Sequence, residues 1–423
     1  AVCMAGMSPA QTPHGTDRMK PRQEGWKLNK VFELYIANAL RDEERYAVLD
    51  LPATPYEMLD ALERAGCRSS EEAYYQVEEY LDFEYLESVI SPDCSLNHLN
   101  ALAEKLSELN DRQSITFEGL LRMEQEKNEG QISIHTLFQL AHNADCCHVV
   151  GEARNDSQLG RFYAENDFFE ELSDLPDKVF DLLDFDRIGR EQRQAEGGVF
   201  TRGGYVVQNT ELEQIPLPDD PPPKPDYTVL LKVSRGYFND GQDDGPSVTI
   251  RLPASEEDLD KVLEQLDVAS WEECGYTCLD CAVPWAREWM EDEEDLGTIQ
   301  PFAEELDQLQ RQGQLPKYKA LLLASRCEDL WDALEMADSM QSMVFTPSIL
   351  SSQDAALAKL QTVFDADNLN ILLRHLDLNG YGNELIAAEH GELTPYGLIR
   401  QQNGEPIPIR QKEDREMRME VCR

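Results

Sequence analysis

Residues Leu183–Tyr205 read LDFDRIGREQRQAEGGVFTRGGY, and residues Leu376–Leu398 read LDLNGYGNELIAAEHGELTPYGL. The two stretches align without a gap at a separation of 193 positions (376 − 183). The positions that are identical in the two stretches are Leu183, Asp184, Gly189, Glu191, Ala195, Glu196, Gly198, Thr201 and Gly204. Chance would give about one or two identities over this length, so we interpret the chain as an internal duplication.

Weaker repeats extend this duplication toward the N-terminus. Leu51-Pro-Ala-Thr54 recurs as Leu252-Pro-Ala-Ser255, and the segment 103–109 recurs as 303–309, about 200 positions later in each case. Between the copies, residues 210–226 contain six prolines. This composition predicts a stiff polyproline-type connector, which marks the clearest domain boundary in the chain.

These boundaries divide the chain into five parts. We expect a flexible leader (1–30), a first copy (31–209), a Pro-rich linker (210–226), a second copy (227–402) and a loose charged tail (403–423). The expected fold class is α+β, as an elongated tandem duplication. Each copy would contain a small β-hairpin or sheet with a helix, a helical middle subdomain and a small closing α+β subdomain.

Each copy begins with the same predicted unit, a β-hairpin followed by a helix. In the first copy, residues 31–40 and 46–51 are strand-like, and Thr54-Pro-Tyr-Glu57 has the form of a capping box at the start of a helix. Met58, Ala61, Leu62 and Ala65 form the apolar stripe of that helix. In the second copy, residues 227–234 and 247–252 are the strands, and Ser255 is the expected helix cap.

The composition is strongly acidic. Asp and Glu total 82 against 38 Lys and Arg, a net charge of −44. This charge disfavours nucleic acid and anionic membranes as partners, since both bind through basic residues. It favours a basic partner surface, and 44 charges match the phosphates of about 22 base pairs of DNA. The alternative interpretation is that the acidity serves solubility or a halophilic habit.

The acidic residues gather in clusters that contain few lysines, and we expect them to form a partner-binding face on rigid helices, laid out as a DNA mimic. The residues of this face are Glu78, Glu79, Asp82, Glu84, Glu87, Glu165, Asp167, Glu170, Glu171, Asp174, Glu291, Asp292, Glu293, Glu294, Asp295, Glu304, Glu305 and Asp307. Taken singly, each cluster is also compatible with an ordinary solvated helix face.

Metal and catalytic motifs are weak. Cys274, Cys278 and Cys281 have the spacing of a radical-SAM iron–sulfur motif, but the same offset in the first copy places Ala73, Val77 and Tyr80 there. The segment 142–148 offers His and Cys residues that suit zinc, although the second copy lacks them. The Asp-x-Asp and Asp-x-Asn starts at Asp184 and Asp377 lack the glutamate that a calcium loop requires. We therefore expect no metal, no cofactor and no catalytic residues.

The location is predicted from the absence of sorting features. No stretch approaches the 18 or so apolar residues of a membrane helix, and no secretory signal precedes the first copy. Ten cysteines lie without the spacing of a disulfide framework, which is typical of reduced thiols. We expect a cytoplasmic protein.

The first copy resembles the ArdA-type antirestriction proteins of conjugative elements. The resemblance covers residues 31–208 and depends on the strand before Leu51-Pro-Ala-Thr54 with its helix, on the segment 137–146, and on Leu159-Gly-Arg-Phe-Tyr163 followed by the motifs in 183–191 and 200–205. In the second copy the Leu-Gly-Arg-Phe-Tyr motif is not recognisable, and Gly397-Leu398 replaces Gly-Tyr.

The resemblance implies an elongated α+β protein whose acidic side chains imitate the phosphates of bent DNA. Such a protein occupies the DNA groove of type I restriction–modification enzymes without catalysis, and its pairing would occur within this chain or as a homodimer. Alternatives are an inhibitor of another nucleic-acid-processing defence nuclease such as a CRISPR effector, a metal-dependent enzyme built on the three cysteines, and a plain acidic scaffold.

Overall fold

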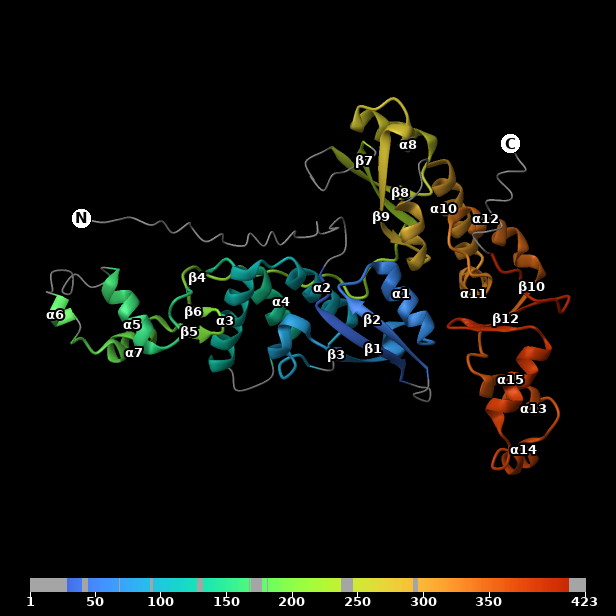
Figure 1. Cartoon of the computed structure of the whole chain (residues 1–423), viewed down its shortest axis with the longest axis horizontal. Coiled ribbons are helices and arrows are strands. Elements are labelled where there is room, and N and C mark those ends of the chain that lie inside the picture. Colours follow the sequence, from blue (N-terminus) through green and yellow to red (C-terminus); the bar gives the residue numbers. More distant parts are fainter. Residues whose placement is uncertain are drawn as a thin grey trace, which may run out of the picture.

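The computed structural model describes residues 29–39, 45–67, 69–91, 94–127, 132–166, 168, 177–180, 182–236, 246–291 and 296–410. The fold is mixed α+β, as expected from the sequence, and its strands form small antiparallel sheets. In Figure 1 the first half (residues 31–209) extends lengthwise from α6 to α1, and the second half (227–410) lies across the α1 end.

The first half opens with a three-stranded sheet in the order β2-β1-β3. Its elements are β1 (Phe32–Asn38), β2 (Tyr46–Leu51), α1 (Pro55–Arg64), η1 (Ser70–Glu72), β3 (Ala73–Glu79) and η2 (Leu81–Leu86). The expected capping box is present, because the Thr54 side chain accepts from the Glu57 backbone N–H and the Glu57 carboxylate accepts from the Thr54 backbone N–H.

The remainder of the first half is a helical middle followed by a second sheet, in the order β4-β6-β5. Its elements are α2 (Leu96–Ser107), α3 (Asp111–Lys127), α4 (Ile134–His142), β4 (Cys147–Val150), α5 (Asp156–Glu165), α6 (Asp177–Phe180), α7 (Phe185–Glu196), β5 (Val199–Thr201) and β6 (Gly204–Gln208). Residues Leu183–Tyr205 therefore form α7, β5 and the start of β6.

The second half follows the same order of sheets and helices. Its first sheet has the order β8-β7-β9 and its second the order β10-β12-β11. Its elements are β7 (Val229–Arg235), β8 (Ser247–Leu252), α8 (Glu256–Leu266), η4 (Trp271–Glu273), β9 (Cys274–Cys281), η5 (Pro284–Ala286), α9 (Arg287–Glu291), α10 (Leu296–Arg311), α11 (Leu315–Ser325), α12 (Leu330–Ser339), η6 (Met340–Ser342), β10 (Met343–Thr346), α13 (Ser352–Gln361), α14 (Ala366–Leu372), α15 (Leu378–Ala388), β11 (Glu392–Thr394) and β12 (Gly397–Gln401).

One side-chain clamp recurs in both halves between the first helix of the middle region and the Leu-Pro-Ala turn. Asn100 on α2 accepts from the Ala53 N–H at 2.8 Å and donates to the Ala53 carbonyl at 3.0 Å. Gln300 on α10 does the same with Ala254, at 3.2 and 3.0 Å. The preceding Leu-Pro bond is cis in both halves. In each half an amide side chain, buried for Asn100 and half-buried for Gln300, satisfies both backbone groups and ties the middle region to its sheet.

We expect Asn100→Ala to lower the free energy of unfolding of the first half by about 1–3 kcal/mol, because it leaves the buried N–H and C=O of Ala53 unpaired. Urea denaturation followed by circular dichroism measures the change. The matched control is Gln113→Ala, which removes an amide whose hydrogen bonds, to the Asp145 carboxylate and from the Asn110 N–H, are both solvent-exposed. If both variants unfold at the same urea concentration, the clamp contributes nothing.

The repeated stretch has the same local structure in both halves. Asp184 caps α7 by accepting from the Arg187 N–H, and Asp377 caps α15 by accepting from the Gly380 N–H. These aspartates, which resemble the first position of a calcium loop, are therefore engaged as helix caps. The Thr201 hydroxyl donates to the Gly204 carbonyl at 2.9 Å, and Thr394 repeats this bond to Gly397 at 2.7 Å.

The linker and the start of the tail pack against the protein. The amide of Asn143, the residue that caps the C-terminus of α4, accepts from the Glu213 N–H at 2.7 Å, and Asn97 on α2 donates to Asp220. Further on, Ile407 is buried, and the Arg410 N–H donates to the Ser325 carbonyl at 2.8 Å. Within the expected tail, these two contacts anchor Ile407 and Arg410, while residues 403–406, 408 and 409 are exposed. Residues 411–423 and the leader lie outside the described residues, apart from 29 and 30.

Candidate binding surface

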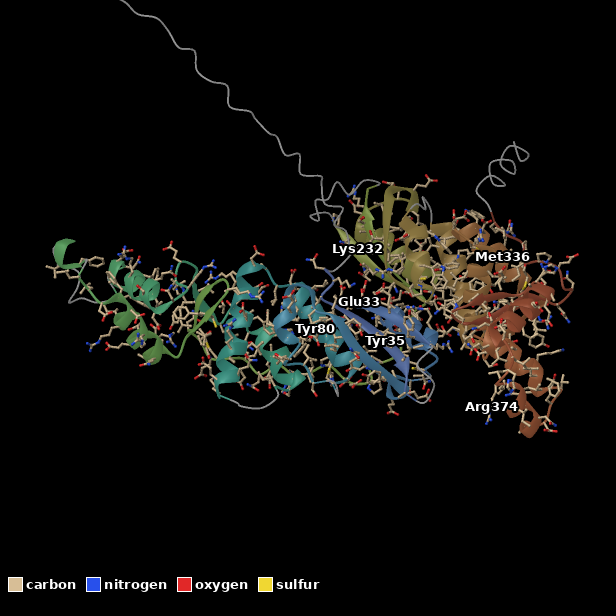
Figure 2. The ribbon with its side chains drawn as sticks, turned by 60° about the horizontal axis from the view of Figure 1, so that its bottom comes forward. Glu33, Tyr35, Tyr80, Lys232, Met336 and Arg374 are labelled. Carbon is tan, nitrogen blue, oxygen red and sulfur yellow. The ribbon has the colours of Figure 1, made fainter. Side chains whose placement is uncertain are left out.

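Five of the expected acidic residues form one exposed surface, which we call the β3–η2 acidic surface. Its members are Glu78, Glu79, Asp82, Glu84 and Glu87. The expectation that they lie on a helix is wrong for Glu78 and Glu79, which end the edge strand β3. Asp82 and Glu84 lie on the 3₁₀ helix η2, and Glu87 directly follows it. The first-half sheet that carries them is seen in Figure 2, where Glu33 and Tyr80 are labelled.

Apolar side chains hold this segment against the first half and direct the acids outward. Tyr75 and Val77 are partly buried against the core, while Phe83 and Leu86 are fully within it. The strand pairs with β1, and Glu33 lies opposite Glu79 in the register. Lys30 pairs with Glu33, so the carboxylate opposite Glu79 is itself neutralised, whereas Glu79 forms no ion pair among the described residues.

The acids of this surface differ from other exposed acids in their ion pairing. Within the described part of the chain, none of the five forms an ion pair, whereas exposed acids elsewhere do. On α7, for example, Arg187 pairs with Glu191 at 2.8 Å and Arg190 pairs with Asp186. A surface that keeps like charges unneutralised on a fixed backbone projects a stronger field than a salt-bridged one.

The other expected acids are placed less uniformly. Glu165 lies in the last turn of α5, exposed, 3.7 Å from Arg161. On α10, Glu304 accepts from Gln300 and Asp307 pairs with Arg311 at 2.7 Å. Burial, with repulsion from Asp338, raises the pKa of Glu305 above its ordinary value. Glu291 ends α9. The expected residues that lie outside the described residues are Asp167, Glu170, Glu171, Asp174, Asp292, Glu293, Glu294 and Asp295.

A further acidic helix face was not predicted as part of the site. The exposed acids of α8 are Glu256, Glu257, Asp258, Asp260 and Glu264. Lys261 pairs with Glu257 at 2.9 Å and with Asp258 at 3.0 Å, and it is the only basic residue of this helix. The sequence signal was present, since three acids occupy the first turn, but acids in that position also stabilise a helix N-terminus.

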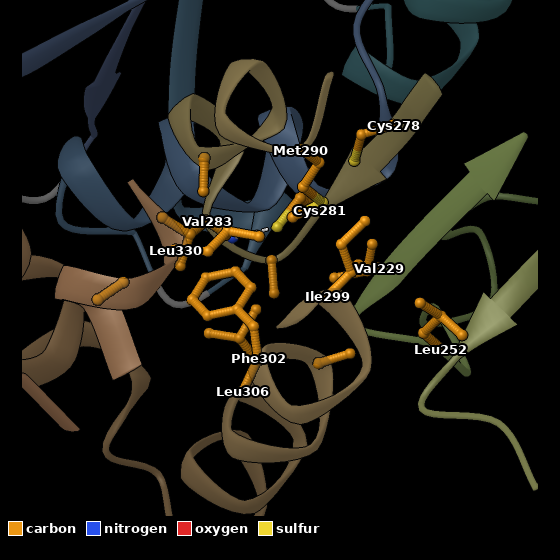
Figure 3. Packing of buried hydrophobic residues seen from close by; sticks show 14 of the residues in the cluster. Val229, Leu252, Cys278, Cys281, Val283, Met290, Ile299, Phe302, Leu306 and Leu330 are labelled. Atoms are coloured by element: carbon orange, nitrogen blue, oxygen red, sulfur yellow. Dashed lines mark hydrogen bonds between the residues drawn. The ribbon is translucent and has the colours of Figure 1, made fainter. Parts of the chain in front are cut away.

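The cysteines of the candidate iron–sulfur motif belong to the hydrophobic core. Cys274, Cys278 and Cys281 are buried in the large cluster of the second half. Figure 3 shows Cys278 and Cys281 among apolar side chains that include Met290 and Ile299. Burial raises the pKa of the Cys281 thiol to about 12 and raises that of Cys278 well above its ordinary value, which disfavours the thiolate that a metal needs.

The candidate zinc segment is also engaged in packing. Cys147 lies buried on β4, and the Cys146 thiol donates to Asn143 and to the Glu211 carbonyl. His142 packs its ring against Phe138 at the end of α4. Among the residues that the structure describes, no group of three or more His, Cys, Asp or Glu side chains is placed to hold a metal ion.

One cavity of about 610 Å³ opens between α3, α5, α7 and β5. Arg122, Arg154 and Arg193 line it, together with Glu126 and Asp156. Arg193 binds the Asp156 carboxylate at 2.8 and 3.2 Å, and Arg122 binds Glu118 at 2.7 Å. Because internal carboxylates already engage two of the three guanidinium groups, this cavity is a weaker candidate site than the acidic surface.

The described residues form a mixed α+β protein in which the sheet orders of the first half recur in the second, and its first half exposes five acids that form no ion pair within the described residues. No protein-family model matches the chain, and no curated protein matches it. Among the described helices, none combines the length and apolar character that a membrane span requires.

Proposed function

We propose that this protein is a non-catalytic DNA mimic of the ArdA type, which occupies the DNA groove of a type I restriction–modification enzyme. The observation that carries the proposal is the β3–η2 acidic surface, whose five acids are exposed and form no ion pair within the described residues. The net charge of −44 and the resemblance of the first copy support the same assignment.

The physical argument for this proposal is that the β3–η2 acidic surface is electrostatically unfavourable in the free protein. Five exposed carboxylates within ten residues of one edge strand and 3₁₀ turn raise the local negative potential, and neighbouring lysines would lower it at little cost. A basic groove that normally binds phosphates supplies the missing counter-charge from outside. Binding would release the counterions of both surfaces, so its affinity would fall steeply with salt.

The decisive experiment is competition. A purified type I methyltransferase core is mixed with the full chain, and binding is measured by calorimetry in 50 and 300 mM salt, with and without a duplex that carries the recognition site. The proposal expects stoichiometric binding that salt weakens and the duplex displaces. Binding that survives high salt and that the duplex leaves intact would exclude mimicry.

Charge reversal tests the surface itself. We expect Glu78→Lys, Glu79→Lys, Asp82→Lys and Glu84→Lys in one variant to slow association with the target about 10- to 100-fold at low salt, through lost electrostatic steering. Stopped-flow fluorescence measures the rate. Reversal of Asp186 and Glu191, which already pair with arginines, is the control and should change the rate much less. Equal slowing by both variants would indicate net charge rather than this surface.

The competition experiment also separates the alternatives. An inhibitor of another defence nuclease, such as a CRISPR effector, would leave the type I core unbound and would compete with nucleic acid on its own target. A plain acidic scaffold would compete with DNA on neither enzyme.

A further inference from the structure

Helix α1 has two different faces. Met58, Ala61 and Leu62 pack into the core of the first half. Tyr56, by contrast, belongs to the hydrophobic cluster of the second half and is only 4% exposed. Tyr56, Glu57, Asp60 and Glu63 recur at helical spacing, so they form a second stripe that faces the second half. In Figure 1, α1 lies next to the middle of the second half.

Lys319 on α11 is the centre of the contact. Its side chain is 3% exposed, and its ammonium lies 2.7 Å from the Asp60 carboxylate and 3.0 Å from that of Glu63. Tyr396, in the turn between β11 and β12, donates its hydroxyl to Asp60 at 2.7 Å, and Arg64 binds the other Asp60 oxygen at 2.8 Å. A buried carboxylate with this many donors is fully satisfied, as a buried charge requires.

The N-terminal end of α1 is held by a second group of contacts. The Tyr56 N–H donates to Asp280 on β9 at 3.4 Å, and the Tyr56 hydroxyl donates to the Tyr227 carbonyl. Arg287, whose side chain is 6% exposed, donates to Glu57 at 2.6 Å. Polar groups from β9, α9, α11 and the β11–β12 turn therefore converge on a single helix.

The equivalent positions of the other copy carry different chemistry. With the offset of 201 set by Thr54 and Ser255 (255 − 54), Asp60 corresponds to Lys261 and Tyr56 to Glu257 on α8. By the same offset, Lys319 corresponds to Glu118 and Arg287 to Leu86. With the offset of 193, Tyr396 corresponds to Gly203. Thus α8 lacks the tyrosine and the central carboxylate of α1, and the first half lacks the cations that receive them.

We propose that the second half carries a docking seat for an acidic helix, formed by Lys319, Arg287, Tyr396 and Asp280, that the chain fills with its own α1. The second half has the seat and the first half has the helix that fills it, so the two halves associate head-to-tail. Because neither half has both parts, the association ends after these two halves. An interface of this heterologous kind would otherwise propagate from chain to chain. The seat fixes the direction in which the two halves extend, independently of what the protein binds.

Two full-length variants test the seat. Tyr56→Ala removes a side chain that contacts the second half without entering the core of the first, and Lys319→Glu places a third carboxylate beside Asp60 and Glu63. For both, we expect the radius of gyration from small-angle scattering to increase. Exchange of the Tyr56 amide, observed in Lys319→Glu, should accelerate about 100-fold or more, because its acceptor lies across the interface.

The controls separate this result from general unfolding. Lys261→Met alters the counterpart of Asp60 on α8 and should leave scattering and exchange unchanged. Amides of β1 and β7 should stay protected in every variant, and Asp60→Lys combined with Lys319→Glu should restore part of the protection that Lys319→Glu loses. Unchanged scattering in both Tyr56→Ala and Lys319→Glu would overturn the proposal. So would a wild-type dimer in sedimentation velocity that Tyr56→Ala dissociates, because α1 would then fill the seat of another chain.

Discussion

Replacing Gly189 with alanine is expected to destabilise the closing part of the first half by about 3 kcal/mol or more, since overpacking against backbone cannot be relieved by a side-chain rotation. A Cβ at this position would lie 1.9 Å from the Asp156 carbonyl oxygen and 2.7 Å from the Gly160 nitrogen. Helices α5 and α7 would have to separate to admit it. Hydrogen exchange of the α5 and α7 amides measures the loss.

The control for this variant is Gly151→Ala, where the nearest atom to a new Cβ is the Gly203 oxygen at 3.8 Å, an ordinary contact. Gly382→Ala supplies a replicate in the second half, because its Cβ would lie 1.7 Å from the Ser352 oxygen between α13 and α15. If Gly189→Ala and Gly151→Ala show equal protection, the close helix crossing does not limit stability.

This crossing explains much of the repeat that reveals the duplication. Gly189 and Gly382 allow two helices to touch, Asp184 and Asp377 cap them, and Gly204 has a φ of +140° that favours glycine. The sequence shows that these residues recur. It does not show why, because the atom that excludes a side chain at Gly189 belongs to another helix, 33 positions earlier (189 − 156).

The sequence predicted an element correctly where interactions between residues close in the chain determine it. The strand 46–51 and the cap at Thr54 lie where the sequence places them. The segment 73–79, which ends in Glu78 and Glu79, is a strand and not the helix on which these two acids were expected. Its strand character comes from pairing with β1, about 40 residues away (73 − 38 = 35 and 79 − 33 = 46).

The seat of α1 was not predictable from either copy alone. On a helix diagram, Glu57, Asp60 and Glu63 form an ordinary solvated acidic face, and only the apolar stripe at Met58 and Leu62 predicts packing. The partner of Glu63 is Lys319, 256 positions away. A comparison of the two copies contains one indication that this face of α1 has a special role: Asp60 of the first copy is replaced by a lysine in the second.

Replacing Asp60 with asparagine is the second variant for which we expect a large effect. The change keeps the shape of the side chain but leaves the buried Lys319 ammonium with Glu63 as its remaining carboxylate. Breaking a buried pair in this way costs about 3–5 kcal/mol, here of the free energy that holds the halves together. Glu63→Gln is the graded control: its side chain is 29% exposed against 5% for Asp60, so its loss should cost about 1 kcal/mol or less.

Acid should reproduce the effect of Asp60→Asn in the wild-type chain. Burial would by itself raise the pKa of Asp60, but Lys319, Tyr396 and Arg64 together hold it below its ordinary value. A depressed pKa contributes stability that is present above the unfolded pKa of about 3.9 and is lost as the pH falls through the folded pKa. Glu63 also faces Lys319, and it is more exposed.

The pKa of Asp280 is shifted in the opposite direction to that of Asp60. Burial raises its pKa, despite hydrogen bonds from Thr54, Tyr227 and the Tyr56 N–H, so its contribution is present below pH of about 3.9 and declines as the pH rises through its folded value. The two carboxyls together predict that protection of the Tyr56 amide, corrected for intrinsic exchange, increases slightly as the pH falls toward about 4 and then decreases steeply. In Asp60→Asn the steep loss of Tyr56 amide protection below about pH 4 should be missing. If that loss is unchanged in the variant, other carboxyls cause the acid sensitivity.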